Sequence, residues 1–129
     1  MAVKALSYIG VNSDKFEDWS EYSQKYLGMQ QMDRGKKILS FRMDDQKQRL
    51  TITGDKGDGL GFLGWEVETK EDLQTFANKL EENKIVVNHG KTSFADKRFV
   101  EDLIYFNDPQ GNRIELVYKP MLDSDPFKP

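Results

Sequence analysis

The sequence contains no cysteine and a single histidine, His89, and these two shortages exclude several kinds of site. Without cysteine there can be no disulfide, no thiolate metal ligand and no cysteine nucleophile. With one histidine, the chain cannot supply a site that needs two imidazoles. The lack of cysteine is also typical of proteins kept in a reducing compartment, so we expect a cytoplasmic location.

Long apolar runs and a strong charge bias are also missing. No apolar stretch approaches the ~20 residues of a membrane-spanning helix, and the first residues lack the apolar core of a signal peptide. The net charge is only -3, although 32% of the residues are charged, and no long basic stripe is present. We therefore expect neither nucleic acid nor a membrane as a partner. A length of 129 residues suits one domain, or two small half-modules that share one core.

Hydrophobic periodicity predicts two successive sets of elements in the same order. The first set is a strand, a helix and three short strands, over residues 4–11, 15–26, 29–34, 37–43 and 48–54. Asp14 and Glu17 have the spacing of a capping box, and Gly28 is a natural stop for the helix. The helix has an aromatic face that we expect to pack into a core, with Phe16, Trp19, Ser23 and Tyr26 at helical spacing.

The second set repeats this order. It is predicted as a strand, a helix and three strands, over residues 60–68, 70–83, 85–87, 99–106 and 113–118. Thr69 and Asp72 predict the helix start. His89 falls in a polar loop, with room for one helical turn between Phe94 and Arg98. The two halves have the same order of elements, but their sequences are not visibly similar.

These elements predict an α+β domain over residues 1–118, made of two modules at about 4–54 and 60–118. Neither half could bury a core alone, so we expect them to form one curved mixed sheet with helices outside. Residues 119–129 contain Pro120, Pro126 and Pro129, and are predicted to be a linker or a terminal arm.

Glu115 is the most unusual residue of the second set. Asp108 to Asn112 form a predicted turn, because Pro109 fixes φ and Gly111 tolerates positive φ. The strand that follows carries Glu115 among aliphatic neighbours. A carboxylate there must be solvated, paired with a basic side chain or bound to a cation, because a bare buried charge is too costly.

Four stretches of the chain resemble the vicinal oxygen chelate superfamily, whose members are built of paired βαβββ modules. They are Leu6 to Val11 with Trp19, Tyr26 to Met29, Gly64 to Val67, and Asp108 to Leu116. The likeness covers residues 4–118. More closely, the chain resembles the N-terminal domain of two-domain extradiol ring-cleaving dioxygenases of the dihydroxybiphenyl type.

The resemblance implies where metal ligands would stand in metal-binding members of the superfamily: at Tyr8, Phe62 and Glu115. Only Glu115 keeps a ligand, because a phenol is a poor divalent ligand at neutral pH and a phenyl ring has no donor. The resemblance thus implies no catalytic residue and no metal in this chain, with Fe(II) held by the catalytic domain of the parent enzyme. Glu115 is then a relic that we expect to bond the Tyr8 hydroxyl.

Three functions are open at this point. The first is a non-catalytic N-terminal dioxygenase domain that packs against the catalytic domain or a second copy of itself. The second is a stand-alone, metal-free binding protein that holds a small aromatic ligand in a cavity, for which the candidate lining residues are Tyr8, Phe41, Phe62 and Trp65. Filling of that space by core side chains is the alternative for those four residues. The third is a glyoxalase-like isomerase or lyase, which would need metal ligands that the sequence does not show.

Overall fold

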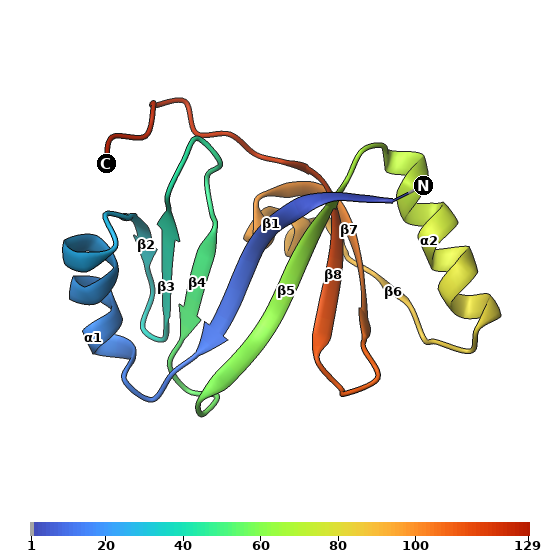
Figure 1. Ribbon diagram of the computed structural model, residues 1–129, viewed down its shortest axis with the longest axis horizontal. Coiled ribbons are helices and arrows are strands. Elements are labelled where there is room, and N and C mark those ends of the chain that lie inside the picture. The colour runs from blue at the N-terminus through green and yellow to red at the C-terminus, as the bar shows by residue number, and fades with distance from the viewer. Residues whose placement is uncertain (1) are drawn as a thin grey trace. The chain divides into compact units, whose positions relative to one another are not determined.

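The computed structural model describes residues 2–129, with the backbone alone at Asp33 and Arg34. The described residues form strands and helices in the order shown in Figure 1: β1 (Val3–Asn12), α1 (Phe16–Glu21), the π-helix η1 (Tyr22–Tyr26), β2 (Gln30–Arg34), β3 (Ile38–Arg42), β4 (Leu50–Thr53), β5 (Gly59–Val67), α2 (Lys70–Glu82), β6 (Asn88–His89), α3 (Thr92–Arg98), β7 (Val100–Asn107) and β8 (Arg113–Pro120). Both parallel and antiparallel strand pairs occur. The predicted α+β class with a mixed sheet is confirmed.

The chain is divided into two compact units. Unit 1 contains residues 2–7 and 62–120, and unit 2 contains residues 8–61 and 121–129. Strands β1 and β5 are therefore each shared between the units.

In unit 2 the strands follow the order β2-β3-β4-β1. Strand β1 runs parallel to β4, with Ile9 opposite Leu50, whereas the other two pairs are antiparallel. Helix α1 contacts β3 and β4. The helix buries Phe16 in an apolar cluster that also contains Leu39, Phe41, Leu50 and Ile52. Each such side chain contributes about 1.5–3 kcal/mol when fully buried, so this cluster holds the helix on the strands.

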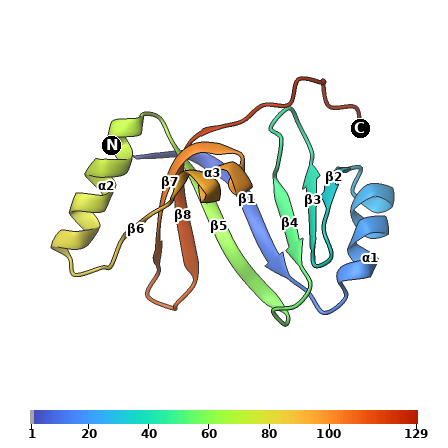
Figure 2. The ribbon, with the colours of Figure 1, turned by 180° about the vertical axis from the view of Figure 1, so that it is seen from behind.

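Unit 1 repeats the same pairing pattern in the order β6-β7-β8-β5. Strand β5 runs parallel to β8, with Phe62 opposite Arg113, and the β7–β8 and β6–β7 pairs are antiparallel. Helix α2 packs against one face of these strands through a cluster of Val67, Leu73, Ala77, Ile104 and Leu116. Successive strand residues point to opposite faces, so Glu115 points away from α2. Figure 2 shows α3 next to β7, which it contacts.

The start of α2 is as predicted. The Thr69 hydroxyl accepts the Asp72 N–H at 3.2 Å, and the Asp72 carboxylate accepts the Thr69 N–H at 3.2 Å, which completes a capping box. These two bonds satisfy donors that the first turn of a helix leaves open.

The predicted first helix over residues 15–26 is partly wrong. Its N-cap is Lys15 and not Asp14, whose N–H instead donates to Asp58 Oδ1 at 2.7 Å. The second half is the π-helix η1, in which Ser23 is fully buried. Tyr26 is 65% exposed, so it does not belong to the core as expected. The wider π-helical turn changes the angular spacing on which that expectation rested.

The strand predicted at residues 85–87 is also wrong. Strand β6 consists of Asn88 and His89, so His89 lies in a strand and not in a loop. The cause lies at the end of α2, where Lys84 has a left-handed φ of 64°. The Ile85 N–H donates back to the Leu80 carbonyl at 3.0 Å, which ties this residue to the helix end. The helical turn expected near residues 94–98 is confirmed and is longer, as α3.

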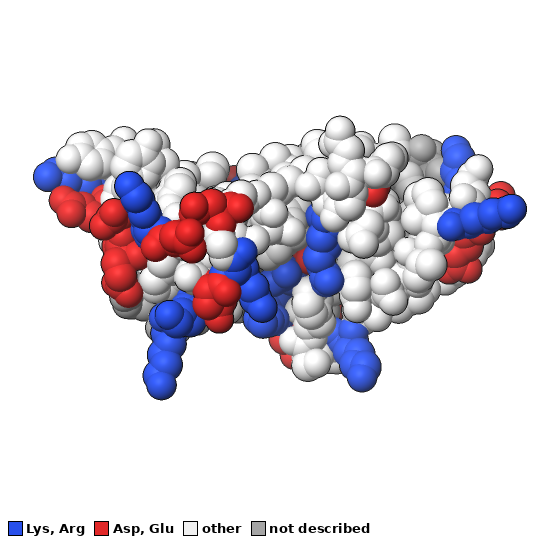
Figure 3. Space-filling model, turned by 90° about the horizontal axis from the view of Figure 1, so that it is seen from below, with Lys and Arg blue, Asp and Glu red and all other residues white. Residues whose placement is uncertain are grey.

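Residues 121–129 lie within unit 2. None of the helices in the described part of the chain is both long enough and apolar enough to cross a membrane. On the face shown in Figure 3, acidic and basic side chains are intermixed, in keeping with the small net charge. The expectations about nucleic acid and membrane partners stay predictions.

Candidate functional site

Glu115 is fully buried and belongs to unit 1. The β7–β8 register places it opposite Tyr105, and the β5–β8 register places it opposite Gly64 on the other side. Its face of the sheet is set by the alternation of β8, in which Leu116 joins the cluster under α2. A charge buried this completely requires hydrogen-bonding partners of opposite charge.

The first partner is Arg98, the last residue of α3. Phe99 follows it in the left-handed region, with φ 55°, and this turns the chain directly into β7. Arg98 Nε donates to Glu115 Oε1 at 2.9 Å, and Arg98 Nη2 donates to Glu115 Oε2 at 3.1 Å. This is the bidentate geometry, in which two parallel hydrogen bonds join a guanidinium to a carboxylate. The Arg98 side chain is only 10% exposed, so the pair is screened little by water.

The second partner is Arg113, two residues before Glu115 on the same face of β8. Its Nε donates to Glu115 Oε2 at 2.9 Å, and its side chain is 31% exposed. Among the described residues, Arg113 Nη2 is buried without a hydrogen-bond partner. One carboxylate therefore lies between two guanidiniums, and the cluster carries one positive charge in excess.

Aromatic rings cover both guanidiniums. The Arg98 guanidinium carbon lies 3.7 Å from the centre of the Phe62 ring and 4.6 Å from that of Phe94. The Arg113 guanidinium carbon lies 3.8 Å from the centre of the Tyr105 ring. Ring faces attract cations, and the attraction grows when water is excluded. The rings thus stabilise the positive charges that Glu115 alone does not balance.

This arrangement does not fit a divalent metal ion at Glu115. Both carboxylate oxygens accept hydrogen bonds from guanidiniums, which would have to be displaced and which repel a cation. The ring of Phe62 has no donor atom and lies against Arg98. In the part of the chain that the structure describes, no group of three or more His, Asp or Glu side chains is placed to hold a metal ion.

Tyr8, the remaining position implied for a ligand, is 2% exposed and belongs to unit 2. Because Glu115 belongs to unit 1, the expected bond between the Tyr8 hydroxyl and Glu115 stays a prediction. Phe41 is part of the unit 2 core. Trp65 borders a shallow apolar hollow of about 310 Å³ together with Phe76 and Leu80. The shared cavity proposed for Tyr8, Phe41, Phe62 and Trp65 also stays a prediction.

A second buried arginine, Arg42, holds the C-terminal segment within unit 2. Its Nη1 donates to the Asp125 carbonyl at 2.7 Å, its Nη2 donates to the Pro126 carbonyl at 3.4 Å, and its Nε donates to Gln30 Oε1 at 3.0 Å. Phe127 lies over the guanidinium at 5.8 Å. A residue with 1% exposure thus fixes the course of the chain near its last described residues.

The turn between β7 and β8 is held by Asp108. Asp108 Oδ1 accepts the backbone N–H groups of Asn112 at 2.8 Å and Gln110 at 2.9 Å. The Asn112 side-chain amide donates to Asp108 Oδ2 at 3.1 Å. The backbone N–H of Asn112 has the largest effect in lowering the pKa of Asp108 from its ordinary 3.8.

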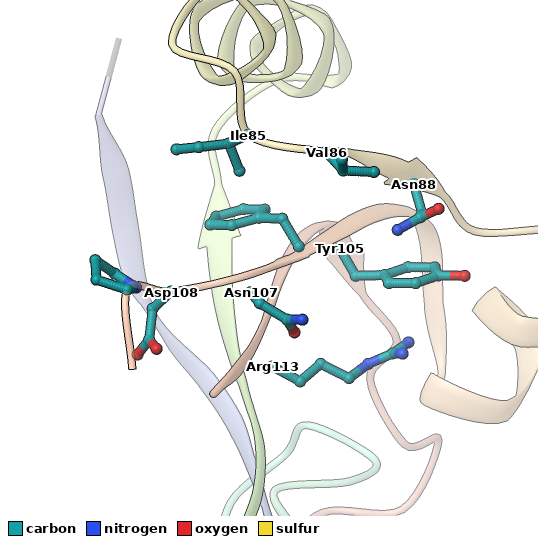
Figure 4. A pocket seen from close by; sticks show the side chains of 9 residues that line it. Ile85, Val86, Asn88, Tyr105, Asn107, Asp108 and Arg113 are labelled. Carbon is teal, nitrogen blue, oxygen red and sulfur yellow. The ribbon is translucent and has the colours of Figure 1, made fainter. Parts of the chain in front are cut away.

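A cavity of about 490 Å³ lies beside the edge of β7 in unit 1 (Figure 4). Strand β6 pairs with β7 at Asn88 and His89, and the preceding residues 85–87 are not part of this pairing. Ile85 and Val86 line one side of the cavity, and Arg113 lines the opposite side (Figure 4). The cavity is thus lined in part by the segment 85–87, which was expected to form a strand and does not.

Sequence reasoning found Glu115 but missed both of its arginine partners. Arg113 could have been found, because residues two apart on a strand share a face. Arg98 left no such signal, because its approach depends on how α3 is placed on the sheet.

Comparison with known proteins finds a family model and several relatives that are similar to this chain. Residues 6–54 match the family model described as dihydroxybiphenyl dioxygenase BphC D1. An iron-dependent extradiol dioxygenase of Rhodococcus jostii (strain RHA1) is 32% identical over 127 residues, covering 95% of this chain and 41% of the relative. A biphenyl-2,3-diol 1,2-dioxygenase of Sphingomonas paucimobilis is 30% identical over 131 residues, covering 100% of this chain and 44% of the relative.

A crystal structure of a catechol 2,3-dioxygenase superposes with a TM-score of 0.93 at 31% identity, covering 100% of this chain and 46% of that one. The chain is therefore similar to the first domain of the extradiol dioxygenases, and it has their vicinal oxygen chelate fold. It is homologous to the N-terminal half of those enzymes and spans less than half the length of the relatives described.

Proposed function

We propose that this chain is the N-terminal, non-metal-binding domain of a type I extradiol catechol dioxygenase. The homology to the first half of such enzymes supports the assignment to this domain. The parent activity would be the Fe(II)- and O2-dependent meta-cleavage of a catechol, such as a dihydroxybiphenyl, in the cytoplasmic breakdown of aromatic compounds. The iron would be held by the second domain.

The observation that carries the proposal is the state of Glu115. Glu115 occupies the position at which metal-binding members of the superfamily place an acidic ligand, and here two guanidiniums hold it. The positive charge that an Fe(II) ion would bring to this carboxylate is thus already supplied by the guanidiniums of Arg98 and Arg113. The ion-paired Glu115 would then have a structural and not a catalytic role, so we assign no catalytic residue to this chain.

The role of the domain would be to pack against the catalytic domain, or against a second copy of itself. The course of residues 121–129 supports a role in domain placement, since Arg42 binds two carbonyls of this segment. A segment that is held in a fixed direction sets where a following domain begins. Ten or so free residues would instead leave that distance and direction variable.

The experiment is to read the natural coding sequence beyond Pro129 and to express what it encodes. We expect the frame to continue into a segment with two histidines and a glutamate at ligand positions, and the longer protein to cleave a catechol when loaded with Fe(II) under anaerobic conditions and then exposed to O2. The 129-residue chain, treated in the same way, is the control, and we expect no ring-cleavage product from it.

A stop codon directly after Pro129 would overturn the proposal. It would favour the second candidate, a metal-free protein that binds a small ligand. The observation in favour of that candidate is the cavity of about 490 Å³ beside β7, whose size lies in the range of small-molecule sites.

A further inference from the structure

The cavity beside β7 combines a partly exposed guanidinium with apolar walls. Arg113 lines the cavity, and its side chain is 31% exposed. The guanidinium also belongs to a cluster with one positive charge in excess, so the acceptor that suits it best carries a negative charge.

The strand register gathers further polar groups on the same side. Asn107 is the direct partner of Arg113 across the β7–β8 pair, and Asn88 is the direct partner of Tyr105 across the β6–β7 pair. Residues 105 and 107 share one face of β7. Figure 4 shows the Tyr105 ring, the Asn107 amide and the Arg113 guanidinium reaching in the same direction. The Tyr105 ring itself lies 3.8 Å from the Arg113 guanidinium carbon, so its position is fixed.

The one acidic group at the cavity does not compete for this guanidinium. Both Asp108 oxygens accept hydrogen bonds from the turn, from the N–H of Gln110 and from the backbone and side-chain N–H of Asn112. Figure 4 shows the Asp108 carboxylate directed away from the Arg113 guanidinium. The rest of the wall is apolar, with Ile85, Val86 and Phe106.

We infer that this cavity is a binding site for a small aromatic carboxylate. The carboxylate accepts hydrogen bonds from the Arg113 guanidinium and the Asn107 amide, and the apolar body lies against Val86 and the neighbouring rings. The cavity volume of about 490 Å³ accommodates a molecule with a single aromatic ring. The site lies wholly between residues 85 and 113 of unit 1, so it needs no second domain and does not depend on the proposed dioxygenase role.

The test is a titration of the 15N-labelled chain with benzoate, followed by amide chemical shifts. We expect saturable shifts at residues 85–88 and 105–113. Benzamide has the same shape without the charge, and we expect it to bind roughly tenfold or more weakly, because it loses a charge-assisted hydrogen bond.

The informative variant is Asn107→Asp. It places a carboxylate beside Arg113 and leaves the Glu115 pairs intact, so we expect the benzoate shifts to be lost while the rest of the spectrum is kept. The matched control is Asn78→Asp on the exposed side of α2, where the Asn78 side chain accepts from Gln74, and benzoate binding should be unchanged. Benzoate shifts that are absent, or that lie elsewhere, or that benzamide or Asn107→Asp reproduce, would overturn the inference.

Discussion

Replacing Glu115 with glutamine is the sharpest perturbation of this fold. The carboxylate is 0% exposed and accepts a two-pronged contact from Arg98 and a third bond from Arg113, at 2.9 to 3.1 Å. Glutamine keeps the shape of the side chain but loses its charge. Its NH2 group would also face the N–H donors of the arginines and could accept no hydrogen bond from them. Arg98, only 10% exposed, would then be a buried cation without a counter-ion.

The expected loss follows from that burial. Removing one partner of a buried ion pair costs about 3–5 kcal/mol, because the remaining charge stays out of water. A domain of this kind has a free energy of unfolding of about 5–15 kcal/mol, so the variant would lose a large share of its stability. Replacing Arg113 with glutamine should cost less, about 1.5–3 kcal/mol, because Arg113 is 31% exposed and Glu115 keeps the Arg98 contact.

The assay is urea unfolding at neutral pH, monitored by circular dichroism. Glu101→Gln is the matched control, since Glu101 is exposed on β7 and should change the free energy of unfolding by less than about 0.5 kcal/mol. If Glu115→Gln fails to fold, the double variant Glu115→Leu with Arg98→Met should recover a folded chain, because it removes the two most buried charges together and leaves only Arg113, which is 31% exposed. A Glu115→Gln variant as stable as the wild type would refute the reasoning.

Three further predictions concern other parts of the chain. The folded-state pKa of Asp108 is lowered, so its contribution to stability is present above its ordinary pKa of 3.8 and is lost as the pH falls through the folded value. NMR titration should show the lowered pKa. The stability deficit of the Asp108→Ala variant should vanish in strong acid. Thr69→Ala should lower the free energy of unfolding by about 0.5–2 kcal/mol through loss of the α2 cap, whereas Thr69→Ser should restore most of it. Arg42→Met should speed hydrogen exchange at the Phe127 amide, and an unchanged rate would show that Arg42 does not hold this segment.

The sequence predicted most of the strands and α2 because each of them carries its own local pattern. The α2 cap needs only Thr69 and Asp72, three residues apart, and the turn before β8 needs only Asp108 to Asn112. These signals act over a few residues, so they can be recognised without knowing the rest of the fold.

The errors occur where a distant or unusual contact overrides local pattern. Asp14 is a residue type that favours helix N-caps, but the helix has Lys15 at its N-cap. The Asp14 N–H instead donates to Asp58, 44 residues away. The apolar segment at residues 85–87 has the pattern of a strand, but the backbone bond from Ile85 to Leu80 holds it at the helix end.

The same limit applies to the site. Glu115 could be recognised as a carboxylate that needs a partner, because its neighbours in sequence are apolar. The identity of the main partner depends on the left-handed turn at Phe99, which brings Arg98 onto the sheet. That turn is a non-glycine residue at positive φ, and local sequence rarely signals it.

The central claim is that guanidiniums hold Glu115 in place of a divalent ion, and metal analysis of the 129-residue chain tests it most directly. The chain is loaded with Fe(II) under anaerobic conditions, freed of unbound metal on a desalting column and assayed for iron per chain. We predict iron far below one ion per chain, with no difference between the wild type and Glu115→Gln. One bound iron per chain that disappears in Glu115→Gln would contradict the account.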